Sequence, residues 1–231
     1  PDGGFAYWPG SHHSDSWVSS MAGHFMTQAA AKGHNISNSV LSSWKKYQNK
    51  TVKAYRHSGR YDLDDLDQAY RLYTLALAGS PDNGAMNRLK ESMSTSDQAR
   101  WMLASAYALC GKKSIAAEML NGTATHIDDY PEADRTFGSA TRDKALALEA
   151  YVLSGELGKA MEIAEEVGRD LGTYGFTTQT AAFAAVAMGR LYEKTGDTSI
   201  KLTVTQEDSG EKSSTQARES WNLDASYGSV R

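Results

Sequence analysis

Glycine residues close a series of helix-length segments, and this pattern constrains the fold more than any other feature of the chain. Six segments are rich in Ala, Leu, Met and Tyr and are joined by short links: Ser16–Lys32, Asp67–Ala78, Gln98–Cys110, Thr141–Ser154, Glu156–Leu171 and Gln179–Thr195. Glycine adopts the left-handed conformation at a helix end without steric cost, so such segments form helical hairpins. Stacked hairpins make a solenoid, or a ring if they close. The sequence therefore predicts an all-α fold.

Apolar side chains recur at three- and four-residue spacing in these segments, and further helices are expected at 38–55, 84–91 and 115–120. The segment 179–194 carries many Ala and Gly residues, so we expect it to approach its neighbours closely on nearly every side. From residue 198 the period changes. Alternation over Ile200–Thr205 predicts a strand, 206–218 reads as a polar link, and Trp221–Leu223 is a candidate partner strand.

Composition narrows the range of partners. The 231 residues include 24 Lys and Arg against 28 Asp and Glu, a net charge of −4 with no basic block. Nucleic acid and anionic membranes are therefore not expected as partners. No apolar stretch is long enough to insert into a bilayer, and no signal peptide is visible. Because the first residue is Pro1, we expect a fragment of a longer protein.

No group of residues assembles into a catalytic or metal site. The six histidines include no pair with the helical spacing and intervening acid that zinc hydrolases use. Cys110, the single cysteine, ends an apolar helix, which favours a buried structural thiol over a nucleophile. The acidic clusters at helix starts are explained by the helix dipole. We therefore expect no catalytic residue, no metal and no cofactor.

Three strings, in order, resemble the thioester domain of bacterial alpha-2-macroglobulins, relatives of the complement components. Residues 2–8 read DGGFAYW and are followed by SWVSS at 16–20, similar to the D-G-G-F-x-x-W pattern and the helix start of that family. Residues 137–146 read FGSATRDKAL, and 174–182 read YGFTTQTAA. The resemblance covers residues 2–195.

The resemblance implies an α/α toroid and a part in a protease trap, an endopeptidase inhibitor and not an enzyme. In that family a protease cleaves a bait segment, and an internal Cys–Gln thioester in a C-x-E-Q motif acylates it. This sequence departs from the pattern, because Cys110 is followed by Gly-Lys-Lys and no Cys-x-Glu-Gln occurs. The motif would lie upstream of Pro1, or the parent would lack a thioester.

The resulting interpretation has two parts. Residues 1–197 would form most of the α/α toroid, and 198–231 would be strands of an adjoining β-sandwich domain. The candidate surface near the thioester comprises Phe5, Tyr7, Trp8 and, beneath them, Trp17. Arg142 and Asp143 are expected near the start of an inner helix, tying the 121–138 loop to the ring.

The implied partners are trapped proteases and the adjoining macroglobulin-type β domains, and the implied location is the periplasm or cell envelope. Two other hypotheses remain open. One is a tetratricopeptide-like scaffold for protein binding, although the loop at 121–138 breaks an even repeat. The other is a carbohydrate-active α/α-barrel enzyme, which the missing acid–base pair disfavours.

Overall fold

The computed structural model describes residues 2–57, 62–92, 96–130, 136–172, 176–196, 202–206 and 210–214. The chain divides into two compact units, residues 1–190 and 191–231. The helices are α1 Ser16–Ala31, α2 Asn38–Ala54, α3 Asp62–Leu77, α4 Asn83–Ser92, α5 Asp97–Leu109, α6 Lys113–Leu120, α7 Ala140–Ser154, α8 Leu157–Leu171 and α9 Thr178–Thr195. The predicted all-α class and the expected helices are confirmed. No helix among the described residues is long and apolar enough to cross a membrane.

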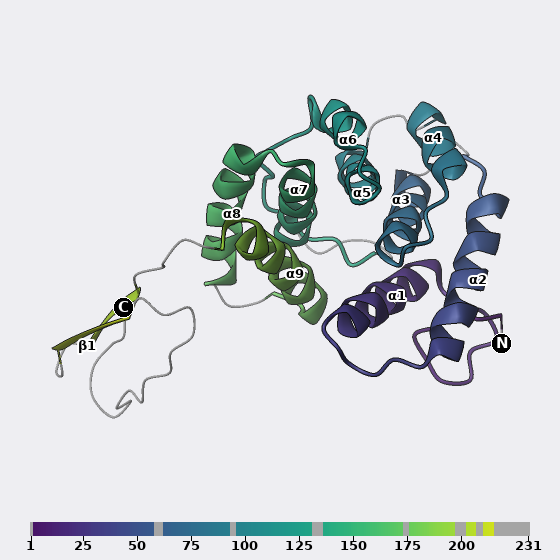
Figure 1. Ribbon diagram of the computed structural model, residues 1–231, viewed down its shortest axis with the longest axis horizontal. Coiled ribbons are helices and arrows are strands. Elements are labelled where there is room, and N and C mark those ends of the chain that lie inside the picture. Colours follow the sequence, from purple (N-terminus) through teal and green to yellow (C-terminus); the bar gives the residue numbers. More distant parts are fainter. Residues whose placement is uncertain are drawn as a thin grey trace. The chain divides into compact units, whose positions relative to one another are not determined.

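The helices of the first unit alternate between two layers, as the hairpin pattern predicts (Figure 1). The inner layer runs α1, α3, α5, α7, and consecutive members of this series pack against one another. Each even-numbered helix lies outside, packed on the inner helix that precedes it. The start of α9 returns to α1, where Trp17 Nε1 donates to Gln179 Oε1 at 3.0 Å. The layers therefore curve back on themselves and do not extend as an open solenoid.

Burial separates the two layers. In α7 the residues from Arg142 to Val152 are all buried, so this inner helix has no solvent face along most of its length. In α8 only four residues are buried, at the three- and four-residue spacing of a single apolar stripe: Ala160, Ile163, Ala164 and Val167. The inner helices therefore form the core, and the outer helices cover it.

The helix α9 differs from the expectation. Its buried residues in the first unit are Thr180, Phe183, Ala184 and Ala187, which lie on one face. Ala182, Ala185 and Gly189 are exposed on the other side. The prediction of close packing on nearly every side was therefore wrong, because small side chains permit close approach but do not supply neighbours.

The second unit contains an antiparallel hairpin of β1 Leu202–Gln206 and β2 Gly210–Ser214, with Leu202 opposite Ser214 and Val204 opposite Lys212. The first strand agrees with the predicted alternation. The second lies within the segment expected to be a polar link, which is a correction. Its sequence GEKSS has no apolar face to reveal it. Trp221–Leu223 lies outside the described residues.

The N-terminal loop is held against α1 and α2 by close backbone contacts. Gly3 has φ +95°, and a Cβ there would lie 2.5 Å from the carbonyl oxygen of Ser43, so only glycine fits. Asp2 accepts from the Gly4 amide at 3.0 Å and from Ser14 Oγ at 2.6 Å. The Phe5 amide donates to Ser19 Oγ at 2.8 Å. These contacts fix the path of the loop that carries Tyr7 and Trp8.

Candidate functional site

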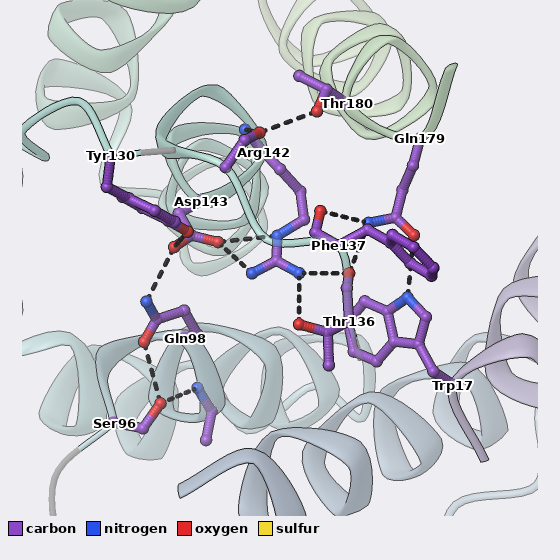
Figure 2. Close-up of polar contacts among 12 residues, drawn as sticks. Trp17, Ser96, Gln98, Tyr130, Thr136, Phe137, Arg142, Asp143, Gln179 and Thr180 are labelled. Atoms are coloured by element: carbon purple, nitrogen blue, oxygen red, sulfur yellow. Dashed lines mark hydrogen bonds and ion pairs between the residues drawn. The ribbon is translucent and has the colours of Figure 1, made fainter. Parts of the chain in front are cut away.

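The three resemblance strings meet at the N-terminal ends of α1, α7 and α9. Gln179 links these helix ends, because the oxygen and the nitrogen of its side-chain amide form hydrogen bonds with different segments of the chain. Its Oε1 accepts from Trp17 Nε1, and its Nε2 donates to the carbonyl oxygens of Thr136 at 2.8 Å and Phe137 at 3.1 Å (Figure 2). A sequence separation of 162 residues is thus bridged by a single side chain.

Arg142 and Asp143 form the buried centre of this site. The Nε and Nη2 atoms of Arg142 donate to Asp143 Oδ1 at 2.8 and 2.6 Å. Its Nη1 donates to the carbonyl oxygen and the hydroxyl of Thr136, at 3.1 and 3.2 Å. The guanidinium also lies over the Trp17 ring, 5.5 Å from its centroid. The expected position at the start of an inner helix is confirmed, and Thr136 ties the preceding loop to that helix.

The other carboxylate oxygen of Asp143 gathers two further segments. Tyr130 OH donates to Oδ2 at 2.6 Å, and Gln98 Nε2 donates at 2.8 Å (Figure 2). Burial, followed by the bond to Asp143, raises the pKa of Tyr130 well above its ordinary value. Asp143 is fully buried and accepts four bonds in total, so its charge is compensated.

Contacts in the structure explain why most positions of the string FGSATRD, residues 137–143, carry the residue that they do. Ser139 caps α7, accepting from the Arg142 amide at 3.2 Å, and its hydroxyl bonds Thr180 Oγ1 at 2.9 Å. A Cβ on Gly138 would lie 3.0 Å from Arg142 Nη2 and 3.1 Å from Tyr130 OH. A larger residue would therefore push apart the groups that surround Asp143.

Phe137 is the residue that sequence reasoning missed. Its φ of 48° is the only positive value at a non-glycine position among the described residues. A bulky side chain in this conformation is strained, and such strain persists where surrounding contacts hold it. Phe137 is 44 % exposed, and the ring of Tyr7 meets it edge-on at 5.8 Å. The available signal was its place as the first letter of FGSATRD.

The four predicted surface residues fall into two groups. Tyr7 is 46 % exposed and Trp8 is 77 % exposed, whereas Phe5 is half-buried. Trp17 is buried and packs on Tyr70, with ring centroids 4.7 Å apart. We use the name aromatic surface for the three exposed residues Tyr7, Trp8 and Phe137.

The polar groups of this site have a structural role. Arg142 and Asp143 form hydrogen bonds with each other and with neighbouring segments of the chain.

Cys110 is half-buried at the C-terminal end of α5 rather than fully buried as expected, and partial burial raises the pKa of its thiol. Among the described residues, no cluster of three or more His, Cys, Asp or Glu side chains could hold a metal ion.

Comparison with solved structures identifies the same fold in bacterial alpha-2-macroglobulins. The native Escherichia coli protein, in a structure from domain MG7 to the C-terminus, matches with a TM-score of 0.72 and 16 % identity over 93 % of this chain and 35 % of its own. The native full conformation of that protein gives 0.71 and 16 %, over 93 % of this chain and 14 % of its own. Salmonella alpha-2-macroglobulin reacted with methylamine gives 0.69 and 17 %, over 93 % and 14 %.

These likenesses show the fold, and the chain spans from 14 % to 35 % of the lengths of those proteins. No protein-family model matches the sequence. No curated protein matches it either.

Proposed function

We propose that residues 1–197 form the toroid of a macroglobulin-like protease trap, and that residues 198–231 belong to an adjoining β-sandwich domain. The observation that carries this proposal is the convergence of the three strings on Gln179, Arg142 and Trp17. The strings resemble one family, and the structure that they stabilise has the fold of proteins in that family. The parent protein would act in the periplasm or cell envelope and capture proteases.

Within that trap, Phe5, Tyr7 and Trp8 would shield or present the thioester region, with Trp17 buried beneath them. Two observations support this assignment. The aromatic surface is exposed and apolar, as a surface that covers a water-sensitive bond must be. The strained Phe137 backbone, held by Gln179, fixes the ring against which Tyr7 packs. The toroid would thus provide a rigid support and not turn over a substrate.

The first experiment incubates the isolated chain with methylamine and measures its mass. A thioester needs a Cys acylated by a Gln three residues on, which Cys110 does not have. We expect no mass gain, no hydrolase activity and slow alkylation of Cys110 in the native state, because a raised thiol pKa lowers the thiolate fraction. A mass gain on the native chain would contradict the proposal that the reactive bond lies elsewhere in the parent.

The second experiment uses a longer polypeptide that contains this chain together with its upstream sequence. Incubation with trypsin should give a complex that survives a denaturing gel, and labelled methylamine should compete with its formation. Trp8→Ala should change the rate of methylamine incorporation without changing the thermal unfolding midpoint, because Trp8 is mostly exposed. Phe25→Ala, which alters a similarly exposed aromatic residue on α1, is the control and should leave that rate unchanged. Equal rates for wild type and Trp8→Ala would remove Trp8 from the proposed surface.

A further inference from the structure

A cavity of about 540 Å³ lies at the C-terminal end of α2, against α3 and α4, and plays no part in the site described above. Its lining includes four basic side chains, which are Lys53, Arg56, His57 and Arg88. No carboxylate lines it among the described residues. In a chain with a net charge of −4, the lining of this cavity is locally positive.

Of the four basic side chains, His57 is paired with the buried Asp65, whereas Arg56 bonds backbone oxygens. Arg56 directs Nη1 at two carbonyl oxygens at the end of α2, those of Lys53 at 2.9 Å and Tyr55 at 2.7 Å. The lining around Lys53 and Arg88 contains no described Asp or Glu side chain. Three permanent positive charges on exposed side chains therefore line one cavity, and an anion bound there would be attracted to all three.

The wall of the cavity is held in place from behind. Asp65, 2 % exposed on α3, accepts from Tyr55 OH and bonds His57 Nδ1 at 2.9 Å. Both Tyr55 and His57 line the cavity, so one buried carboxylate orients two of its side chains. A preorganised wall lowers the entropy that a ligand must lose on binding.

The floor of the cavity is apolar. Val52, Ala85 and Leu89 line it, and each is at most 3 % exposed as a whole residue. Basic groups together with a buried apolar floor match a ligand that has a negative group attached to an apolar body.

We propose that this cavity binds a small organic anion, a carboxylate or a phosphate ester with an apolar body. Arg88 and Lys53 would contact the anionic group, and Val52 and Leu89 would contact the apolar part. The inference rests on the cavity and its charges, so it stands independently of the protease-trap proposal.

The test titrates the ¹⁵N-labelled chain with benzoate, phenyl phosphate and the neutral isostere benzamide, and follows amide chemical shifts. We expect saturable shifts at residues 52–57 and 85–92 with both anions, and binding at least about tenfold weaker with benzamide, since a charge-assisted hydrogen bond is lost. The ratio of the benzoate and phenyl phosphate affinities identifies which anionic group the cavity prefers. Inorganic phosphate should bind more weakly than phenyl phosphate.

Arg88→Gln should weaken binding of the anions about tenfold, and Lys53→Gln should do so as a second variant. Lys50→Gln removes the same charge from the same helix as Lys53→Gln but outside the cavity lining, so it should leave affinity unchanged. The proposal is overturned if benzamide binds as well as benzoate, if the shifts saturate elsewhere, or if neither cavity variant weakens binding.

Discussion

The consecutive helices α7 and α8 have the same length, 15 residues each, but opposite relations to charge. The inner helix α7 buries Arg142, Asp143, Lys144 and Glu149. The outer helix α8 buries only apolar residues, and its charges lie outside the stripe. Burying a charge costs free energy unless an oppositely charged or polar group contacts it. The inner helix therefore carries the larger cost, but it also has more neighbouring side chains that can act as partners.

Arg142 and Asp143 pair with each other, and the other two buried charges of α7 are matched by charges on different helices. Lys144 Nζ lies 3.0 Å from Asp170 Oδ2 and 3.5 Å from Glu166 Oε2, both on α8. Glu149 accepts from Tyr73 OH at 2.6 Å and pairs with Arg190. Charges on the inner helix therefore act as buried connectors between helices. On the outer helix, Glu166 and Asp170 are partners of these connectors, and the other charges face solvent.

The strongest way to break this contrast is to remove a connector. Arg142→Ala leaves Asp143 buried without its ion-pair partner, and we expect a loss of about 3–5 kcal/mol in the free energy of unfolding. Denaturant unfolding measures it. Any partner binding per folded molecule should be unchanged, because Arg142 has no exposed surface to offer.

The matched control for that variant is Arg169→Ala on α8. Its guanidinium is exposed and makes one long bond, at 3.4 Å, to the Glu165 carbonyl oxygen. We expect a change within about 0.5 kcal/mol. Comparable losses in the two variants would show that inner and outer charges do not differ, and a loss of binding at full stability would show that Arg142 has a functional role.

The next largest effect concerns the network around Glu149. His24 bonds Tyr70 OH at 3.1 Å through Nδ1 and lies 3.4 Å from Tyr73 OH through Nε2. Burial lowers the pKa of His24 from 6.5 to about 4, with Glu149 opposing and Arg190 reinforcing this shift. Between pH 6.5 and about 4, His24 is therefore protonated in the unfolded chain but neutral in the folded chain. Stability should fall by roughly 3 kcal/mol as the pH decreases from about 6.5 to about 4.

Unfolding measured at several pH values separates this contribution from others. His24→Gln should have a shallower loss of stability over that range, because the substituted side chain cannot be protonated. His34→Gln, at an exposed position, should retain the wild-type slope. An unchanged slope in His24→Gln would show that His24 is not the group that titrates.

The smallest expected effect tests the exposed face of the outer helix α8. Gly168 lies on the exposed face of α8, and a Cβ there meets nothing within 4 Å. Gly168→Ala should stabilise the protein by about 0.5–1 kcal/mol through helix propensity. Gly23→Ala on α1 is the opposite case, because its Cβ would lie 1.9 Å from Trp44 Cζ2, and it should be destabilising. A loss of stability in Gly168→Ala would mean that α8 is covered there.

The helices could be predicted from sequence because their signals are local. Ser139, Ser96 and Asp15 each accept a bond from the third amide of the helix that they cap, and Gly155 takes the left-handed conformation after α7. Local sequence does not determine which face of a helix packs against another helix. The exposed face of α9 and the polar strand β2 were missed for this reason, since neither leaves an apolar pattern to read.

The candidate site could be predicted in part. Trp17, Arg142 and Asp143 stood out as members of recognisable strings, and their burial follows from the inner position. Phe137 did not, because a positive φ depends on the carbonyl contacts made by Gln179, which is 42 residues away in sequence. The basic cavity was also missed, because Arg88 belongs to a different helix from Lys53 and only the fold brings the two together.

The bond between Trp17 and Gln179 also has a consequence for the order in which the protein is made. Each pair from α1 to α8 is a local hairpin whose contacts can form soon after both helices have been synthesised. Gln179, by contrast, meets Trp17 across 162 residues. The Trp17 indole N–H therefore lacks this partner until Gln179 on α9 has been synthesised. The contact between α9 and α1 thus forms later in synthesis than the contacts within each helical hairpin.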